Sequence, residues 1–306
     1  MTTTSPSILS RYLDPEALGR MAGRTFDPRG LVIGSLAGHH RSPLSGFAVE
    51  FAGHREYVPG DDPKHIDWRV YYNRDKYFIK QYEMETNLVC HLLLDVSASM
   101  RYGEGETQKL LAAAQLAIML AHCVVRQGDK VAVATFDEEI RGQLPAGGSP
   151  AQITRFIEHL ESIEPVKKTR MADCLGAAQA SMGRREIVVV FSDFFTDLEA
   201  LEKCLQRFRY DRHEVVLFQV LHPDELEFRL DGLVKFRGLE SDAELLAAPS
   251  DLRTRYLAAL RSFNERLADV CSRNRVERVL VDTGRDRADV LIDHLNARGL
   301  VHRGRG

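Results

Sequence analysis

Hydrophobic residues along this chain form two kinds of pattern, short continuous runs and longer stretches in which apolar positions recur every three or four residues. The short runs, such as 88–95 and 130–136, are rich in Val, Leu and Ala. Such runs are typical of strands buried on both faces of a parallel sheet, and the longer stretches predict helices. The two alternate from about residue 87 onward, which predicts an α/β fold with a doubly wound, mostly parallel sheet.

Two segments break this alternation. Residues 1–86 predict an N-terminal extension, with a helix over 14–22 and a strand over 76–83. Its segment 30–75 is rich in Gly, Pro, His, Arg and Asp, which predicts loops with short strands. Residues 222–275 predict an insertion before the last strand. The α/β domain itself therefore runs over 87–306. Its expected strands are 88–95, 130–136, 140–144, 186–191, 214–221 and 278–282, and its expected helices are 108–126, 149–163, 171–182, 198–208, 251–273 and 287–298.

Composition changes this picture little. The chain has 306 residues and a net charge of -3, which gives no electrostatic reason to expect a nucleic-acid partner. Five scattered cysteines without C-x-x-C spacing favour free thiols in a reducing compartment. The N-terminus has no signal-peptide pattern, and no apolar run approaches the roughly 18 residues that a membrane span needs. We therefore expect a cytoplasmic protein with no membrane span.

Oxygen-bearing side chains follow the ends of the predicted strands. In a doubly wound sheet, ligands bind beyond the carboxyl ends of the strands, and Mg²⁺ prefers oxygen ligands. Asp and Ser also form turns and cap helices, so any one of these positions has a purely structural alternative. The candidates after the first core strand are Asp95, Ser97 and Ser99, those after the strand at 186–191 are Ser192 and Asp193, and Thr169 precedes the helix at 171.

The D-x-S-x-S loop, the Thr and the later Asp together resemble a von Willebrand factor A domain. The resemblance covers about 87–221 and 276–300. It implies a metal-ion-dependent adhesion site holding Mg²⁺ or Mn²⁺, with the ligands Asp95, Ser97, Ser99, Thr169 and Asp193.

Residues 38–68 resemble domain-of-unknown-function family 58, bacterial proteins with a von Willebrand factor A-like core. The matching residues are Ser42, Gly46, Glu50, Phe51, Arg55, Tyr57, Gly60, Asp61, Asp62, Ile66, Asp67 and Trp68. This resemblance implies a MoxR-type AAA+ ATPase as partner and a role in protein assembly, maturation or chaperone-like remodelling.

Charged residues of the same region have two interpretations. They form either a partner-facing surface or ion pairs that fix the segment in place, and the second is favoured. Trp68, the only tryptophan, is expected to be a packing anchor. The candidate partner-binding residues are Arg55, Asp61, Asp62, Asp67, Arg69 and Arg170.

These patterns predict a non-enzymatic, divalent-metal-dependent protein-binding module. Neutral hydroxyl ligands would leave the cation electrophilic, with a position open for an Asp or Glu of a partner. The alternative is a Mg²⁺-dependent phosphohydrolase that uses Asp95 as nucleophile. That chemistry needs a second carboxylate two residues later, where Ser97 stands, and no suitably placed lysine is evident. The motifs of serine hydrolases and nucleotide-binding loops are absent from the sequence.

Overall fold

The computed structural model describes residues 8–29, 40–41, 50–58, 66–68, 70–71, 76–83, 85–86, 88–163, 170–183, 185–230, 234–237, 244–247 and 249–303. The chain divides into two units, Met1–Arg29 together with Val89–Gly306, and Gly30–Leu88. The first 29 residues therefore belong with the α/β core rather than with the segment that follows them.

Six strands form the sheet of the larger unit in the order β12-β9-β8-β5-β6-β7. All neighbours are parallel except β7, which runs antiparallel to β6. The chain starts in the middle at β5, moves to one edge and then crosses to the other, so the sheet is doubly wound and its direction switches between β5 and β8. The strands are β5 (Val89–Asp95), β6 (Lys130–Phe136), β7 (Ile140–Gly147), β8 (Ile187–Ser192), β9 (Glu214–Leu221) and β12 (Glu277–Asp282).

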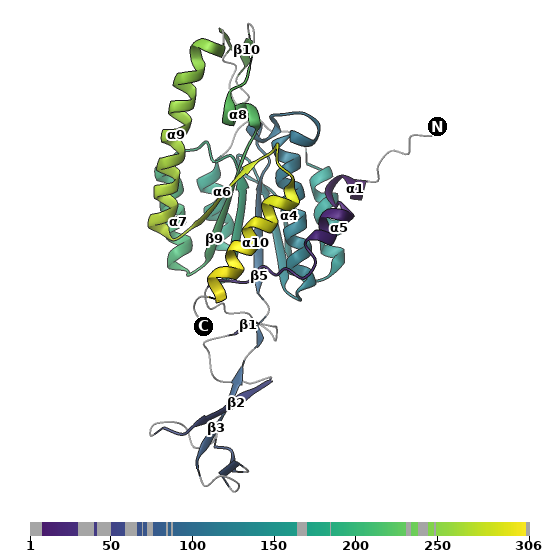
Figure 1. Cartoon of the computed structure of the whole chain (residues 1–306), viewed down its shortest axis with the longest axis vertical. Helices are drawn as coiled ribbons and strands as arrows, with labels where there is room; N and C mark the ends of the chain where they lie inside the picture. The colour runs from purple at the N-terminus through teal and green to yellow at the C-terminus, as the bar shows by residue number, and fades with distance from the viewer. Residues whose placement is uncertain are drawn as a thin grey trace, which may run out of the picture. The chain divides into compact units, whose positions relative to one another are not determined.

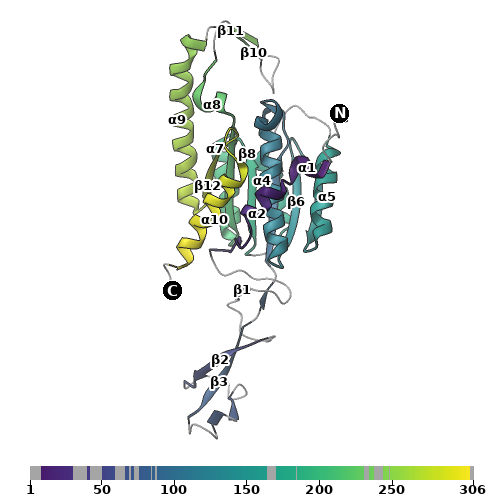
Figure 2. The same cartoon turned by 45° about the vertical axis from the view of Figure 1, so that its right-hand side comes forward.

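Helices cover both faces of this sheet (Figures 1 and 2). One face carries α4 (Lys109–Arg126), α5 (Pro150–Glu161) and α10 (Arg287–Arg303), with α1 (Ile8–Tyr12) and α2 (Pro15–Arg20) packed against them. The other face carries α6 (Met171–Ala180), α7 (Leu198–Tyr210) and α9 (Pro249–Asn274). The predicted fold class, an α/β fold with a doubly wound, mostly parallel sheet, is confirmed.

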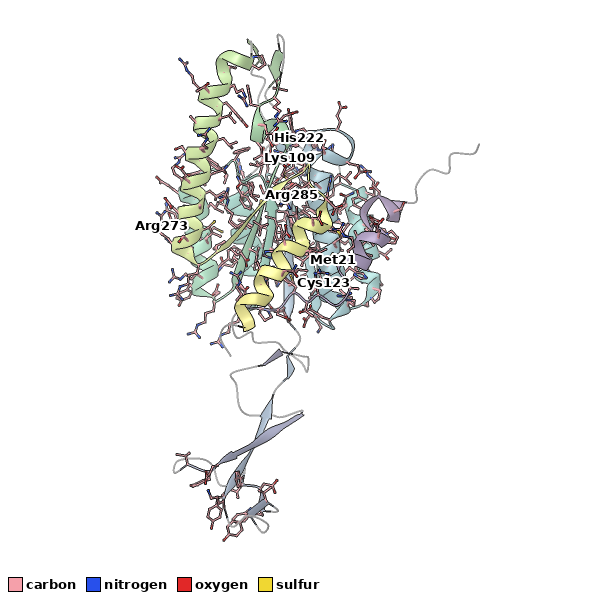
Figure 3. All side chains as sticks on the ribbon, in the orientation of Figure 1. Met21, Lys109, Cys123, His222, Arg273 and Arg285 are labelled. Atoms are coloured by element: carbon pink, nitrogen blue, oxygen red, sulfur yellow. The ribbon has the colours of Figure 1, made fainter. Side chains whose placement is uncertain are left out.

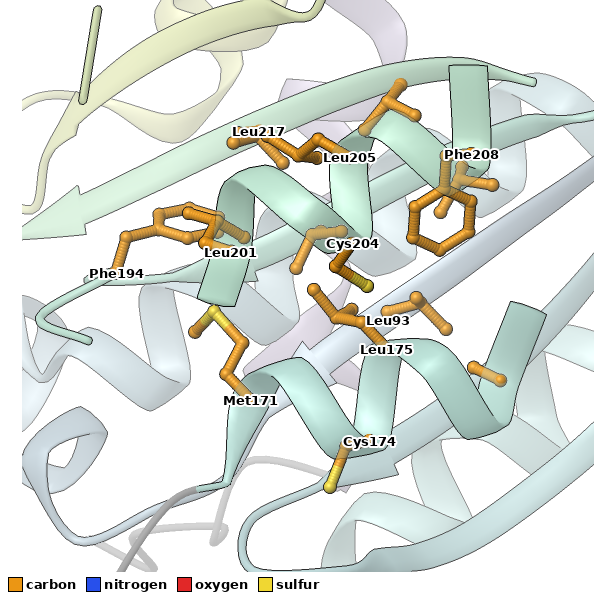
Figure 4. Close-up of a cluster of buried hydrophobic side chains, with 14 of the residues drawn as sticks. Leu93, Met171, Cys174, Leu175, Phe194, Leu201, Cys204, Leu205, Phe208 and Leu217 are labelled. Atoms are coloured by element: carbon orange, nitrogen blue, oxygen red, sulfur yellow. The ribbon is translucent and has the colours of Figure 1, made fainter. Parts of the chain in front are cut away.

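The core under α6 and α7 fixes one of the loops that matter below (Figure 4). Leu93 of β5, Leu217 of β9 and Leu201 of α7 are fully enclosed there, together with Phe194 from the loop after β8. Phe194 has a φ of +59°, a left-handed backbone conformation that is uncommon for a non-glycine residue. Its buried ring anchors a tight turn beyond the end of β8.

Helix α4 is the most buried helix of the core. Within the described residues it is the one helix long and apolar enough to cross a membrane by length and composition, and 78% of that stretch is buried inside the fold. The expectation that no such run exists is therefore wrong for α4, although its burial is that of a core helix. The predicted free cysteines are confirmed, since all five thiols are buried and unpaired with one another.

The insertion contains more structure than its sequence predicted. It begins with the short helix α8 (Pro223–Glu227), continues through the hairpin of β10 (Val234–Arg237) and β11 (Glu244–Ala247), and ends in α9. Strand β7 also runs past Pro145, where the sequence predicted its end, because a proline is tolerated in an edge strand.

The smaller unit contains two antiparallel strand pairs. Strand β1 (His40–Arg41) pairs with β4 (Glu85–Thr86), and β2 (Glu50–Glu56) pairs with β3 (Phe78–Glu83). Trp68 is 56% exposed, so it is not the buried anchor that we expected. Its ring contacts Tyr71 and Tyr77 edge-on, at centroid distances of 6.1 and 6.3 Å.

Candidate functional site

Asp95 lies at the switch point of the sheet, where β5 and its neighbour β8 end. It is fully buried, and both of its carboxylate oxygens accept hydrogen bonds. The Ser97 amide donates to Oδ1 at 2.9 Å, and the Ser192 hydroxyl donates to Oδ2 at 2.7 Å. The carboxylate is thus held between two strand ends at the position where doubly wound sheets bind their ligands.

Two serines of the same loop extend this group toward solvent. The hydroxyls of Ser97 and Ser99 are 3.2 Å apart. Ser97 is buried, whereas Ser99 is half-buried at the start of the 3-10 turn Ser99–Arg101. Two hydroxyl oxygens next to a carboxylate are the donors that a hard cation prefers, and Ser99 gives the group its open side.

Asp193 comes from the loop that Phe194 anchors, and is 3% exposed. Its Oδ1 accepts a hydrogen bond from the Phe195 amide at 3.1 Å, and its backbone carbonyl accepts one from Gln219 Nε2 at 3.3 Å. Because Ser192 bonds to Asp95, the two aspartates lie on adjoining loops. Four of the five predicted ligands are therefore gathered at one edge of the sheet, while Thr169 lies outside the described residues.

The structure adds a lysine that the sequence did not reveal. Lys109 Nζ donates to Asp193 Oδ2 at 2.8 Å and to Glu225 Oε1 at 2.9 Å, and its side chain is 1% exposed. It lies beside His222 at the carboxyl end of the strands (Figure 3). Lys109 is the first residue of an otherwise apolar helix, and a lysine in that position is rarely buried without a carboxylate partner. That was the available signal for finding it.

Charge in this group is not balanced. Asp95, Asp193 and Glu225 bring three carboxylates to a single ammonium. Burial, and then the negative charge of Asp193, raise the pKa of Asp95 to about 7, although hydrogen bonds from Ser192 and Ser97 act in the opposite direction. A buried, uncompensated carboxylate is costly, and a divalent cation beside Asp95 would compensate it. The residues present therefore fit a hard divalent cation.

The fit depends on the serines. Across the parts of the chain that the structure describes, no group of three or more His, Cys, Asp or Glu side chains is arranged to hold a metal ion. A cation at the switch point would accordingly be held by two aspartates and neutral hydroxyls. This is the donor set that suits Mg²⁺ or Mn²⁺ better than zinc.

The candidate partner-binding residues are dispersed between the two units. Arg170 is exposed at the start of α6, where its amide donates to the Asp137 carbonyl at 2.9 Å. Asp67 is buried in the smaller unit, which favours its structural interpretation. Arg55 belongs to β2, and its side chain is not among those described. Asp61, Asp62 and Arg69 lie outside the described residues.

Comparison with known proteins identifies the family. The family described as "Protein of unknown function DUF58" matches residues 53–266, well over half of the chain. This chain belongs to the DUF58 family. Among curated relatives, the uncharacterized proteins Rv1480 of Mycobacterium tuberculosis and Mb1516 of Mycobacterium bovis are each 26% identical over 240 residues, which is 77% of this chain and 75% of theirs.

Solved structures with a similar fold include two from Bacteroides. One is BatB of Bacteroides thetaiotaomicron, with 16% identity, a TM-score of 0.43, and coverage of 70% of this DUF58 chain and 99% of that one. Another is an aerotolerance-related membrane protein of Bacteroides fragilis, with 18% identity, a TM-score of 0.47, and coverage of 71% and 100%. The SpRpn10 VWA domain matches with 11% identity and a TM-score of 0.40, covering 67% of this chain and 94% of that domain.

Two expectations are corrected by these findings. The prediction of a cytoplasmic protein with no membrane span is contradicted, because the matching structures include an aerotolerance-related membrane protein and an uncharacterized membrane spanning protein. The findings also give no support to a MoxR-type ATPase as the partner of this DUF58 protein, and that assignment is withdrawn.

Proposed function

We propose that this DUF58 protein binds another protein in a divalent-cation-dependent manner through Asp95, Ser97, Ser99 and Asp193. A von Willebrand factor A-like fold suggests a protein-interaction module and is usually non-enzymatic. The metal dependence is our addition to that general assignment. The cation would be Mg²⁺ or Mn²⁺, and Thr169 remains a predicted further ligand.

The observation that carries this proposal is the excess of buried carboxylate at the switch point. Asp95 is fully buried and is compensated by hydrogen bonds rather than by a neighbouring ammonium. A cation held there by two serine hydroxyls would keep much of its charge, and so would attract an Asp or Glu of a partner.

The rim of the site suits a protein partner. Ser99 is half-buried on the open side. Phe195, two residues after Asp193, is 42% exposed. An exposed aromatic ring beside a charged centre offers apolar contact around a polar anchor, as is common in protein interfaces. The chain's own residues would thus orient a partner carboxylate and bury apolar area around it.

Calorimetric titration of the full chain with Mn²⁺ tests the proposal. We expect one site in the wild type and loss of more than about tenfold in affinity for Asp95→Asn and for Asp193→Asn, because each removes a charged ligand. Asp197→Asn is the matched control. Asp197 is exposed in the same loop and caps α7 through the Glu199 amide at 3.0 Å, a role in which Asn serves equally well.

Unchanged Mn²⁺ affinity in both site variants, with both folded, would refute the assignment. An equal loss in Asp197→Asn would show that the effect is general to the loop rather than specific to the site.

One observation favours the alternative of a phosphohydrolase. Lys109 supplies the lysine that was not evident from the sequence, close to Asp193. However, Asp95 and Lys109 are both enclosed, and Ser97 stands where the acid/base carboxylate is needed. We expect no turnover of p-nitrophenyl phosphate with Mg²⁺. Turnover that disappears in Asp95→Asn would establish the alternative instead.

A further inference from the structure

Lys109 connects the candidate cation site to a second element, the short helix α8. Its ammonium is bonded at similar distances to Asp193 on one side, 2.8 Å, and to Glu225 of α8 on the other, 2.9 Å. The ring of Phe195 lies 5.8 Å from the same nitrogen. The Lys109 ammonium therefore bonds both to Asp193, a predicted metal ligand, and to α8, a helix that is not part of the cation site.

Helix α8 is attached to the loop before α4 by several other contacts. The Tyr102 hydroxyl donates to Asp224 at 3.3 Å, and the Thr107 hydroxyl lies 3.1 Å from His222 Nε2. Glu225 itself completes a capping box, because its Oε2 accepts from the His222 amide at 2.8 Å. The position of Glu225, and so its hold on Lys109, depends on whether α8 is docked on this loop.

The same helix opens the insertion. Arg253 of α9 donates to the Glu227 carbonyl at the end of α8, at 3.1 Å. Phe263 of α9 contacts Phe195 with the ring centroids 5.4 Å apart. A partner that binds the insertion and moves α8 would therefore change the surroundings of Lys109.

We propose that Lys109 competes with the cation for Asp193, and that docking of α8 strengthens cation binding because Glu225 draws Lys109 away from Asp193. The inference rests on the proposed function and adds its regulation. Coupling between two sites is reciprocal, so occupancy of the cation site should in turn stabilise the docked position of α8.

Two substitutions separate this competition from simple charge effects. Lys109→Met keeps the length of the side chain and removes its charge, and Glu225→Gln keeps the shape and the backbone hydrogen bond. We expect Mn²⁺ to bind more than about tenfold tighter in Lys109→Met and about tenfold weaker in Glu225→Gln, within the usual range of coupling between sites. The decisive variant is the double mutant, measured in the same calorimetric titration.

If Glu225 acts through Lys109, its substitution has no effect once Lys109 is gone, and the double mutant binds within about threefold of Lys109→Met. If Glu225 merely attracts the cation through space, Glu225→Gln weakens binding by the same factor in both backgrounds, which overturns the proposal. Weaker binding in Lys109→Met overturns it as well.

Hydrogen exchange gives a readout that is independent of affinity. Saturating Mn²⁺ should slow exchange of the amides at 222–228 in the wild type and leave them unchanged in Lys109→Met; equal slowing in both chains overturns the coupling. Absence of Mn²⁺ binding in both chains overturns the proposed function itself. Binding in Lys109→Met alone, lost again when Asp95→Asn is added, supports the competition, because it shows that Lys109 excludes the cation from that site.

Discussion

Two buried ionic clusters lie at opposite ends of the same sheet, and they differ in charge balance. At the amino ends of β9 and β12, Glu214 and Glu277 face Arg298 and Arg29. Arg298 bonds to both carboxylates and, at 2.8 Å, to the Asp27 carbonyl, and Arg29 Nη2 donates to Glu277 at 2.8 Å. At the carboxyl ends, Lys109 bonds to Asp193 and Glu225, while Asp95 accepts hydrogen bonds from Ser97 and Ser192.

The balanced cluster has a structural role. It fastens α10 and the segment before residue 30 to the sheet, with the Arg298 guanidinium 4.4 Å above the buried ring of Phe26. Burial, followed by the charges of Arg298 and Arg29, lowers the pKa of His294 to about 3, so that ring stays neutral and leaves the balance unchanged. We therefore expect a ligand at the uncompensated cluster and none at the balanced one.

Removing the cation of the balanced cluster should have the largest effect. In Arg298→Met two half-buried carboxylates lose their buried partner, so we expect the free energy of unfolding to fall by about 3–5 kcal/mol. Urea unfolding with and without Mg²⁺ measures this, and Mg²⁺ should not restore the loss. Arg285→Met, which breaks an exposed pair with Asp293, is the control and should cost less than about 1 kcal/mol. Rescue of Arg298→Met by Mg²⁺ would show that the two clusters do not differ as argued.

The same substitution at the other cluster should behave differently. Lys109→Met in the presence of chelator should lose about 3 kcal/mol, because it leaves Asp193 and Glu225 unpaired. Here a divalent cation can replace the lost charge, and free Mg²⁺ at a hundred times its Kd should return about 2.7 kcal/mol. Thermal or urea unfolding measures both values. A loss that Mg²⁺ cannot reverse would contradict the view that Lys109 and the cation serve the same carboxylates.

The pH dependence of the metal-free protein should give the smallest effect per pH unit and should come from the uncompensated cluster. The pKa of Asp95 rises from 3.8 to about 7 on folding, so the native state holds a proton that the unfolded chain has released. Stability is therefore fully present below pH 4 and is lost as the pH rises through about 7, by at most about 1.4 kcal/mol per pH unit. Urea unfolding between pH 5 and 7.5 tests this. Mg²⁺ or Asp95→Asn should flatten the profile, and a slope that persists in Asp95→Asn would assign it to another group.

The strands could be predicted because short, continuous apolar runs are typical of strands that are buried on both faces of a sheet. The continuous apolar runs of β6 and β9 are buried on both faces, and their observed bounds match the predicted ones. Asp95 and Asp193 could be placed together because parallel strands bring their carboxyl ends to one edge. Helix α8 was missed because five residues carry no periodic pattern. Lys109 was missed because its partner Glu225 is 116 residues away in sequence, and composition does not report such a pairing.

Lys109 is the first residue of α4, and α4 is clamped between the sheet and its neighbouring helices. The Lys109 ammonium therefore extends from a firmly packed helix. Asp193 belongs to a loop, and Glu225 belongs to a helix of five residues. A rearrangement at this end of the molecule would therefore move the Asp193 loop, α8 and the Lys109 side chain, while the backbone of α4 stays in place. Helix α4 would then be the fixed support against which the loop and α8 change position.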